Sequence, residues 1–241
     1  MANIIKIDNA ILKRTKRTLT KKRKQAVKDL NVYFLIVCEG EKTEPNYFKS
    51  FKKNVKSFVY NIETRGEGSN TLDLVKRTIK ARNSSSQQYD RVWVVFDKDS
   101  FTAANFNSAI LLAENNNINA GWTNEAFELW YLLHFQYRNS AMSREDYKSA
   151  IEAEINAIIR KKSKSKNPKL FTYKKNSEEM YDILLKYGNQ SQAIRWAQNL
   201  MGAHNCTNYA THNPCTKIHL LVEELNGESE ELKHELENRN S

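Results

Sequence analysis

Acidic residues follow two apolar runs of the chain, at the point where each run ends. Glu39 comes directly after residues 32–38, and Asp97 and Asp99 come after residues 91–96. Carboxylate oxygens are the ligands that Mg²⁺ and Mn²⁺ prefer, and a cation relieves the repulsion between clustered carboxylates. Divalent ions held in this way orient a water and stabilise the leaving oxygen in phosphodiester cleavage. We therefore predict Glu39, Asp97 and Asp99 as metal ligands and catalytic residues.

Other charged residues near these acids could take part in the same chemistry. Glu41 is a candidate metal ligand, and Glu44 is a candidate catalytic acid or additional ligand. Lys42 or Lys98 could neutralise charge that builds up on a phosphate group. The alternative is that acids at such positions only cap turns and helices. Two acidic strand ends in one basic protein favour the metal site.

Two residues further along the chain are also candidates. Glu128 could complete the acidic site, or it could be an ordinary helix-surface or capping acid. His219 could contact or orient a phosphate, or donate a proton, or it could make a structural hydrogen bond. The His and Cys residues between positions 204 and 219 match no standard zinc-finger spacing, so we do not predict zinc.

The elements that must position these residues alternate between strands and helices. Apolar runs predict strands over residues 32–38, 57–63, 91–96 and 118–123, with helical patterns between and after them. This alternation predicts an α/β fold, with a Rossmann-like parallel four-stranded sheet and helices on both faces. The carboxyl ends of parallel strands open into one crevice, so the acids after the first and third strands should lie together.

The chain divides by composition into four parts. We predict a basic N-terminal arm over residues 1–30, a catalytic domain over 31–140, a helical C-terminal region over 141–226 and an acidic tail over 227–241. The C-terminal region should pack on the catalytic domain and return residues 213–219 towards the crevice.

Charge and composition indicate the kind of partner and the compartment. The net charge of +10 and the isoelectric point of about 9.4 indicate a polyanionic partner. We expect basic residues of the N-terminal arm and of the run 160–169 to contact a nucleic-acid backbone, and among them are Lys22, Arg23, Lys161 and Lys162. The alternative is that the arm and the run are only a solvated arm and loop.

Three cysteines, no apolar segment of membrane-spanning length and no apolar leader predict a cytoplasmic protein without disulfides.

Four segments carry a resemblance to a known family. They read VCEGEKTEPNYF (37–48), WVVFDKD (93–99), NEAFELWYLLHF (124–135) and NPCTKIHLLVEEL (213–225). In order and spacing they resemble the motifs of RloB-family proteins over roughly residues 32–226. At positions 125–126 the family often has Pro-Cys where this chain has Glu-Ala, so we do not make Glu125 a required ligand.

The resemblance implies a Toprim-like fold, related to the catalytic domains of topoisomerases, primases and OLD-family nucleases. Glu39 falls on the Toprim glutamate, and Asp97 and Asp99 fall on the Asp-x-Asp pair. Glu44 resembles an additional acid of the OLD-type nucleases, at a different spacing. The resemblance also implies a role in bacterial defence against phage, including abortive infection. Because the sequence has no Gly-x-x-x-x-Gly-Lys-Ser/Thr loop, we expect any ATPase to be a separate partner.

These observations predict a Mg²⁺- or Mn²⁺-dependent nuclease that acts on RNA, tRNA included, or on DNA. One alternative is a non-catalytic nucleic-acid-binding subunit that recruits a partner ATPase or toxin. A second is a nucleotidyl- or phosphotransferase that uses the same acids. Whether the chain forms a homo-oligomer stays open.

Overall fold

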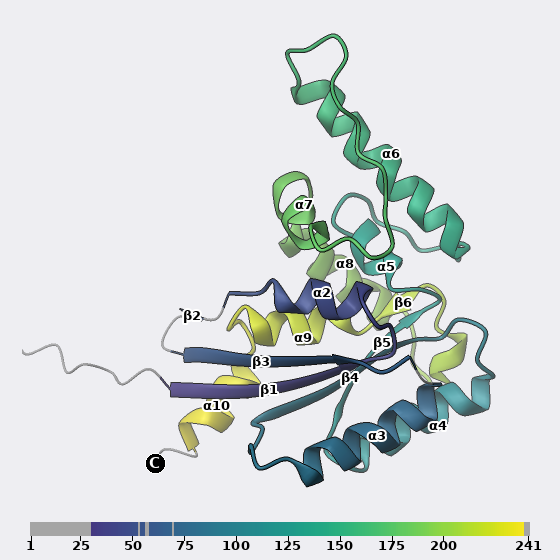
Figure 1. The fold of residues 1–241 in the computed structure, drawn as a ribbon. Coiled ribbons are helices and arrows are strands. Elements are labelled where there is room, and N and C mark those ends of the chain that lie inside the picture. The colour runs from purple at the N-terminus through teal and green to yellow at the C-terminus, as the bar shows by residue number, and fades with distance from the viewer. Residues whose placement is uncertain (1–29, 53, 56–57, 69, 239–241) are drawn as a thin grey trace, which may run out of the picture.

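The computed structural model describes residues 30–52, 54–55, 58–68 and 70–238 (Figure 1). Nearly all of the predicted basic arm, with Lys22 and Arg23, lies outside the described residues. Six strands form one sheet: β1 (Leu30–Cys38), β2 (Asn54–Val55), β3 (Phe58–Gly66), β4 (Arg91–Asp97), β5 (Asn119–Asn124) and β6 (Cys215–Thr216). The helices are α2 (Thr43–Lys49), α3 (Thr71–Ser84), α4 (Ala103–Glu114), α5 (Glu128–Leu132), α6 (Arg144–Lys162), α7 (Met180–Tyr187), α8 (Gln190–Gly202), α9 (Ile218–Leu225) and α10 (Glu230–Asn238), with a 3-10 turn η1 (Tyr209–Thr211).

The strand order is β2-β3-β1-β4-β5-β6. The four strands predicted from the sequence, β1, β3, β4 and β5, are mutually parallel, as expected. The prediction of only four strands was wrong, because β2 and β6 pair antiparallel with β3 and β5 at the two edges. Each of these edge strands has two residues, which is too short to produce an alternating or continuous apolar pattern.

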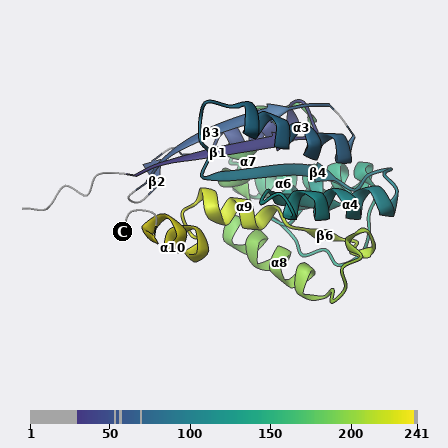
Figure 2. The same cartoon turned by 90° about the horizontal axis from the view of Figure 1, so that it is seen from below.

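Helices cover both faces of the sheet, as predicted (Figures 1 and 2). In β1, Phe34 and Ile36 face one core cluster, whereas Leu35 and Val37 face the other. The cluster behind Leu35 and Val37 is covered by α3 and α4, and the cluster on the opposite face lies under α2, α5 and α9. All four side chains are at most 1% exposed, which explains why β1 is a continuous apolar run.

The helix after β5 is shorter than the sequence predicts. Apolar residues continue from Phe127 to Phe135, but α5 ends at Leu132 and turns follow it. Trp130 is fully buried, and its indole N–H donates to the Tyr47 hydroxyl at 2.8 Å. The apolar run therefore reflects burial on all sides and not a long regular helix.

The C-terminal region contributes both helices and a strand. Its α8 and α9 pack on the sheet, and β6 brings the segment around residue 215 beside β5, so this segment returns to the sheet as expected. The acidic segment predicted as a tail contains α10, whose Leu232 and Leu236 are buried. Arg91 links β4 to this region by ion pairs to Glu224 at 3.0 Å and Glu235 at 2.6 Å. Among the described residues, no helix combines the length and apolar composition that crossing a membrane requires.

Helix α6 and the segment after it stand out from the rest of the molecule (Figure 1). Residues 163–179, here called the return segment, run back along α6 towards the sheet. Asn156 of α6 accepts from the Phe171 amide at 2.7 Å and donates to the Phe171 carbonyl at 2.9 Å. Glu152 accepts from the Tyr173 amide at 2.9 Å. These bonds hold the return segment against the helix.

Asn156→Ala should release the return segment without unfolding the sheet. The substitution removes both hydrogen bonds of a residue that is 7% exposed, and we expect a loss of roughly 1–3 kcal/mol of local stability. Trypsin should therefore cleave the lysine-rich return segment faster than in the wild type. Asn199→Ala, at an exposed position of α8, is the matched control. Equal cleavage rates in the wild type and Asn156→Ala would show that these bonds do not hold the segment.

Candidate functional site

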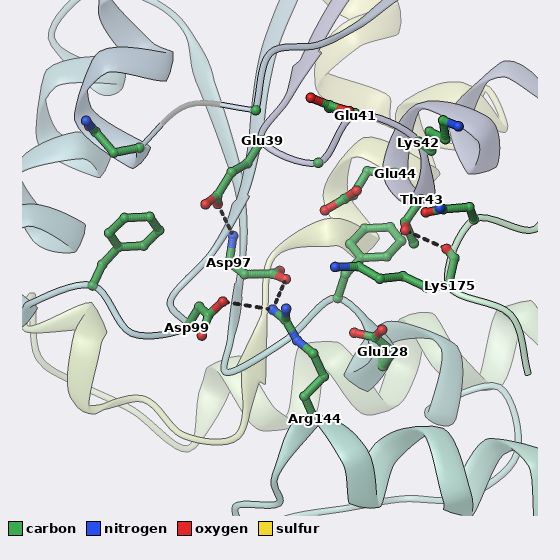
Figure 3. Close-up of a pocket in the computed structure, with 16 residues that line it drawn as sticks. Glu39, Glu41, Lys42, Thr43, Glu44, Asp97, Asp99, Glu128, Arg144 and Lys175 are labelled. Atoms are coloured by element: carbon green, nitrogen blue, oxygen red, sulfur yellow. Dashed lines mark hydrogen bonds and ion pairs between the residues drawn. The ribbon is translucent and has the colours of Figure 1, made fainter.

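A cavity of about 670 Å³ opens at the carboxyl ends of β1 and β4 (Figure 3). Because parallel strands place their carboxyl ends at one edge, this is where a doubly wound sheet binds ligands. Six acidic and three basic side chains line the cavity. The acids are Glu39, Glu41, Glu44, Asp97, Asp99 and Glu128, of which Glu41 and Asp99 are exposed, and the bases are Lys42, Arg144 and Lys175. The acids predicted from separate parts of the sequence therefore lie together.

Glu39 is placed by the backbone pairing of β1 with β4. Its amide donates to the Val95 carbonyl at 2.8 Å, which continues the ladder one residue beyond the strand. Its carboxylate in turn accepts from the Asp97 amide at 3.2 Å. Burial, offset in part by this hydrogen bond and reinforced by the charge of Glu44, raises the pKa of Glu39 to about 7. The carboxyl group therefore gains or loses a proton near neutral pH.

Asp97 and Asp99 lie at the end of β4 and share one counter-ion. Asp97 is 7% exposed, and Asp99 is exposed with a φ of +36°, a backbone conformation that Asp tolerates better than most residues. The Arg144 guanidinium lies 3.2 Å from an Asp97 oxygen and 3.3 Å from an Asp99 oxygen (Figure 3). Burial, followed by the charges of Glu44 and Glu128, raises the pKa of Asp97 well above its usual range.

Glu44 reaches the cavity from the first turn of α2 because Gly40 leaves room for it. A Cβ at position 40 would lie 2.1 Å from a Glu44 carboxyl oxygen, so a larger residue there would displace this side chain. Burial, and then the charge of Glu128, raises the pKa of Glu44. The neighbouring Thr43 hydroxyl donates to the Lys175 carbonyl at 2.6 Å, which ties this helix start to the return segment.

Glu128 enters the cavity at the start of α5 and is 3% exposed. Its carboxylate accepts from the Tyr173 hydroxyl at 3.1 Å. Burial and the neighbouring Glu128 raise the pKa of Tyr173, so this phenol stays protonated and keeps donating. The sequence left open whether Glu128 completes the acidic site or is an ordinary helix-surface or capping acid. The structure favours the first alternative, because this acid lies inside the cavity and not on the helix surface.

The donor chemistry of the cavity suits a hard divalent cation. One oxygen of Glu44 and one oxygen of Asp97 are buried and have no hydrogen-bond partner. A buried carboxylate oxygen without a partner is costly, and a cation would satisfy it. As the side chains lie, however, no three His, Cys, Asp or Glu residues in the described part of the chain are arranged to hold a metal ion. Binding would therefore require the carboxyl groups to turn, with Arg144 leaving its place between Asp97 and Asp99.

Several predicted residues lie at the edge of this site or away from it. Glu41 and Lys42 line the cavity, and both are exposed. Lys98 is not among the lining residues, and its ammonium donates to the Asp99 carbonyl at 3.3 Å. The exposed Lys161 and Lys162 end α6, away from the sheet (Figure 1).

The structure does not bring His219 to the cavity, which corrects its prediction as a catalytic residue. This side chain is fully buried in α9, and one ring nitrogen contacts the Thr216 carbonyl at 3.1 Å. Burial lowers its pKa to about 4, so the ring is neutral at physiological pH. Because its burial comes from the packing of β6 and α9 on the sheet, the motif alone could not reveal it.

The other His and Cys residues of this region also lie outside the cavity. The Cys206 sulfur lies 3.4 Å from a ring nitrogen of His212, and the His204 ring stacks on His212 with centroids 4.3 Å apart. Cys215 is buried in β6. Among the described residues, no three His, Cys, Asp or Glu side chains are grouped here so that they could hold a metal ion.

Three residues of the site were not identified from the sequence: Arg144, Tyr173 and Lys175. Arg144 follows Ser143, which caps α6 in a capping box with Asp146, and nothing in this local pattern indicates a site. Tyr173 and Lys175 come from the irregular return segment. Only the lysine content of that segment was a signal, and it does not single out Lys175.

Comparison with known proteins gives one match, to a protein family, and this match covers most of the chain. A family model described as RloB-like protein matches residues 34–225, which include the second half of β1, the residues of the acidic cavity and α9. The chain belongs to the RloB family. The family assignment made from the four motifs is thereby confirmed. No curated protein and no solved structure shows significant similarity to this RloB-family chain.

The acidic cavity should make the metal-free protein less stable as the pH rises. The pKa of Glu39 is about 7 in the folded protein against an ordinary value of 4.5, so folding favours the protonated form. The stabilisation is fully present below about pH 4.5 and is lost as the pH rises through 7. In EDTA, Glu39→Gln should remove on the order of 2 kcal/mol of this pH dependence, measured by urea unfolding at several pH values. Glu231→Gln, at an exposed position of α10, is the control, and an unchanged slope in Glu39→Gln would contradict the assignment.

Proposed function

We propose that this RloB-family protein is a nuclease that hydrolyses phosphodiester bonds of RNA or DNA with Mg²⁺ or Mn²⁺. The observation that carries the proposal is the pair of buried, unpartnered oxygens of Glu44 and Asp97 inside a cavity at the sheet's carboxyl edge. The basic character of the chain supports a polyanionic substrate. The four parallel central strands, with Glu39 after one and Asp97 after its neighbour, support a Toprim-like arrangement.

The chain's own groups take distinct roles in this proposal. Glu39, Asp97 and Asp99 would hold the metal, with Glu44 as an additional ligand. Bound there, Mg²⁺ or Mn²⁺ would supply an activated water and stabilise charge on the phosphate. Arg144 and Lys175 would bind the phosphate oxygens, and Tyr173 would hold Glu128 in position through its hydroxyl.

A role in defence against phage is part of the same proposal. It is supported by membership of the RloB family. A separate ATPase remains the partner that we propose, and the cytoplasm is the proposed site of action.

Asp97→Asn should abolish cleavage while leaving the fold intact. It removes one charge from the proposed ligand set, and we expect a loss of at least about 100-fold in the rate. The assay is gel analysis of labelled RNA, tRNA and DNA with Mn²⁺, Mg²⁺ or EDTA, and Glu231→Gln is the control.

The same gels, together with a phage-protection assay in cells, separate the proposal from its rivals. A joined or extended product that requires a nucleoside triphosphate would indicate transfer and not hydrolysis. Phage protection that persists in Asp97→Asn would indicate a non-catalytic binding subunit. Either result would overturn the nuclease proposal.

Arg144 should act on the substrate and not on metal binding. Arg144→Ala should lower kcat/KM by roughly 10- to 1000-fold, because the half-buried guanidinium proposed to bind the phosphate is lost. Arg144→Lys should recover only part of this, since an ammonium cannot make the two parallel bonds of a guanidinium. In Arg144→Ala, the Mn²⁺ concentration that gives half-maximal rate should equal the wild-type value or lie below it, because the guanidinium no longer competes with Mn²⁺ for the carboxylates.

Lys148→Ala is the control for Arg144, since Lys148 lies on the same helix and pairs with Glu145 at 2.6 Å. A higher Mn²⁺ requirement in Arg144→Ala would show that this residue instead organises the carboxylates for the metal.

A further inference from the structure

The tip of α6 and the return segment carry an unbalanced positive charge. Six basic residues fall within ten positions and no acid interrupts them: Arg160, Lys161, Lys162, Lys164, Lys166 and Lys169. All six are exposed, and none forms an ion pair within the described residues. Like charges crowded in this way repel each other, and a polyanion would relieve the repulsion.

The charge continues from the tip to the cavity. The return segment carries the exposed Lys174 and Lys175 at its far end, and Lys175 lines the cavity. Basic side chains thus occur at both ends of the stretch that joins the tip to the carboxylates, and the four residues between them, 170–173, carry no charge. Figure 1 shows this segment running beside the outer part of α6 before it turns towards the sheet.

The distance between tip and cavity is held by the structure. Arg144, at one end of α6, contacts Asp97, and the basic tip lies at the other end of this 19-residue helix. At 1.5 Å per residue the helix spans roughly 27 Å. The hydrogen bonds of Asn156 and Glu152 fix the return segment to it, and the bond from Tyr173 to Glu128 joins that segment to the cavity.

We propose that α6 and the return segment form a phosphate-backbone track that makes the cavity act on long nucleic acids. A stem must extend about 8 base pairs, at 3.4 Å each, to reach the tip while one phosphate lies in the cavity. This inference rests on the proposed nuclease function and adds the substrate class: double-stranded or folded nucleic acid at least that long. A shorter stem reaches only the cavity.

Binding of hairpins to the full chain tests the track. Fluorescence anisotropy in EDTA compares stems of about 5 and about 20 base pairs, each as DNA and as RNA. Two charge reversals are used, one of Lys161, Lys162 and Lys164 to Glu, the other of Lys164, Lys166 and Lys169 to Glu. The control is Lys76→Glu with Lys80→Glu, on α3 across the sheet, and thermal melting checks each fold.

The long stem should bind each tip variant on the order of 100-fold more weakly than the wild type, with a salt slope reduced by about 0.9 per lost contact. The short stem should bind all proteins alike. An equal loss for both stems, or no loss for the long stem, would overturn the track. The nucleic acid that shows the larger length dependence, DNA or RNA, is the substrate type that the track fits.

Cleavage of the same hairpins with Mn²⁺ separates this inference from the proposed function. If the wild type cleaves and the tip variants cleave the long stem equally well, the track is wrong and the nuclease stands. If binding depends on length and the tip charges but no hairpin is cleaved, the track stands and the nuclease proposal fails.

Discussion

The burial of several like-charged carboxyl groups at one edge of the sheet is the constraint on which this site depends. Glu44, Asp97 and Glu128 are each less than 9% exposed and share one cavity. Taking ionised carboxylates out of water costs several kcal/mol each unless counter-charges compensate. Arg144 and Lys175 supply part of that compensation. The raised pKa values of Glu44 and Asp97 show that it is incomplete.

Arg144 and Lys175 both belong to one projecting element, made of α6 and the return segment, and this element therefore reaches the carboxylates of the cavity. Arg144 starts α6 and Lys175 ends the segment that returns along it. Tyr173, on the same segment, binds Glu128. A movement of α6 or of the return segment would therefore change the balance between carboxylates and cations in the cavity.

Gly40 and Gly66, near the carboxyl ends of β1 and β3, are as necessary for the shape of the cavity as its acids are. A Cβ at Gly40 would meet the Glu44 carboxylate, and a Cβ at Gly66 would lie 2.5 Å from the Glu41 backbone. Without these glycines the loop after β1 could not pack against β3 and leave space for Glu44. The Glu-Gly-Glu sequence is thus explained by packing as well as by charge.

The sequence alone determined the four central strands and the meeting of Glu39 with Asp97 and Asp99. Long apolar runs are local signals, and a parallel sheet brings its carboxyl ends to one edge whatever the details of the loops. The edge strands β2 and β6, the burial of His219 and the roles of Arg144 and Tyr173 were decided only by the tertiary structure. Arg144 is 47 residues from Asp97, and Tyr173 is 45 residues from Glu128. Such contacts depend on where α6 packs, because no local pattern records which distant side chain will meet a buried charge.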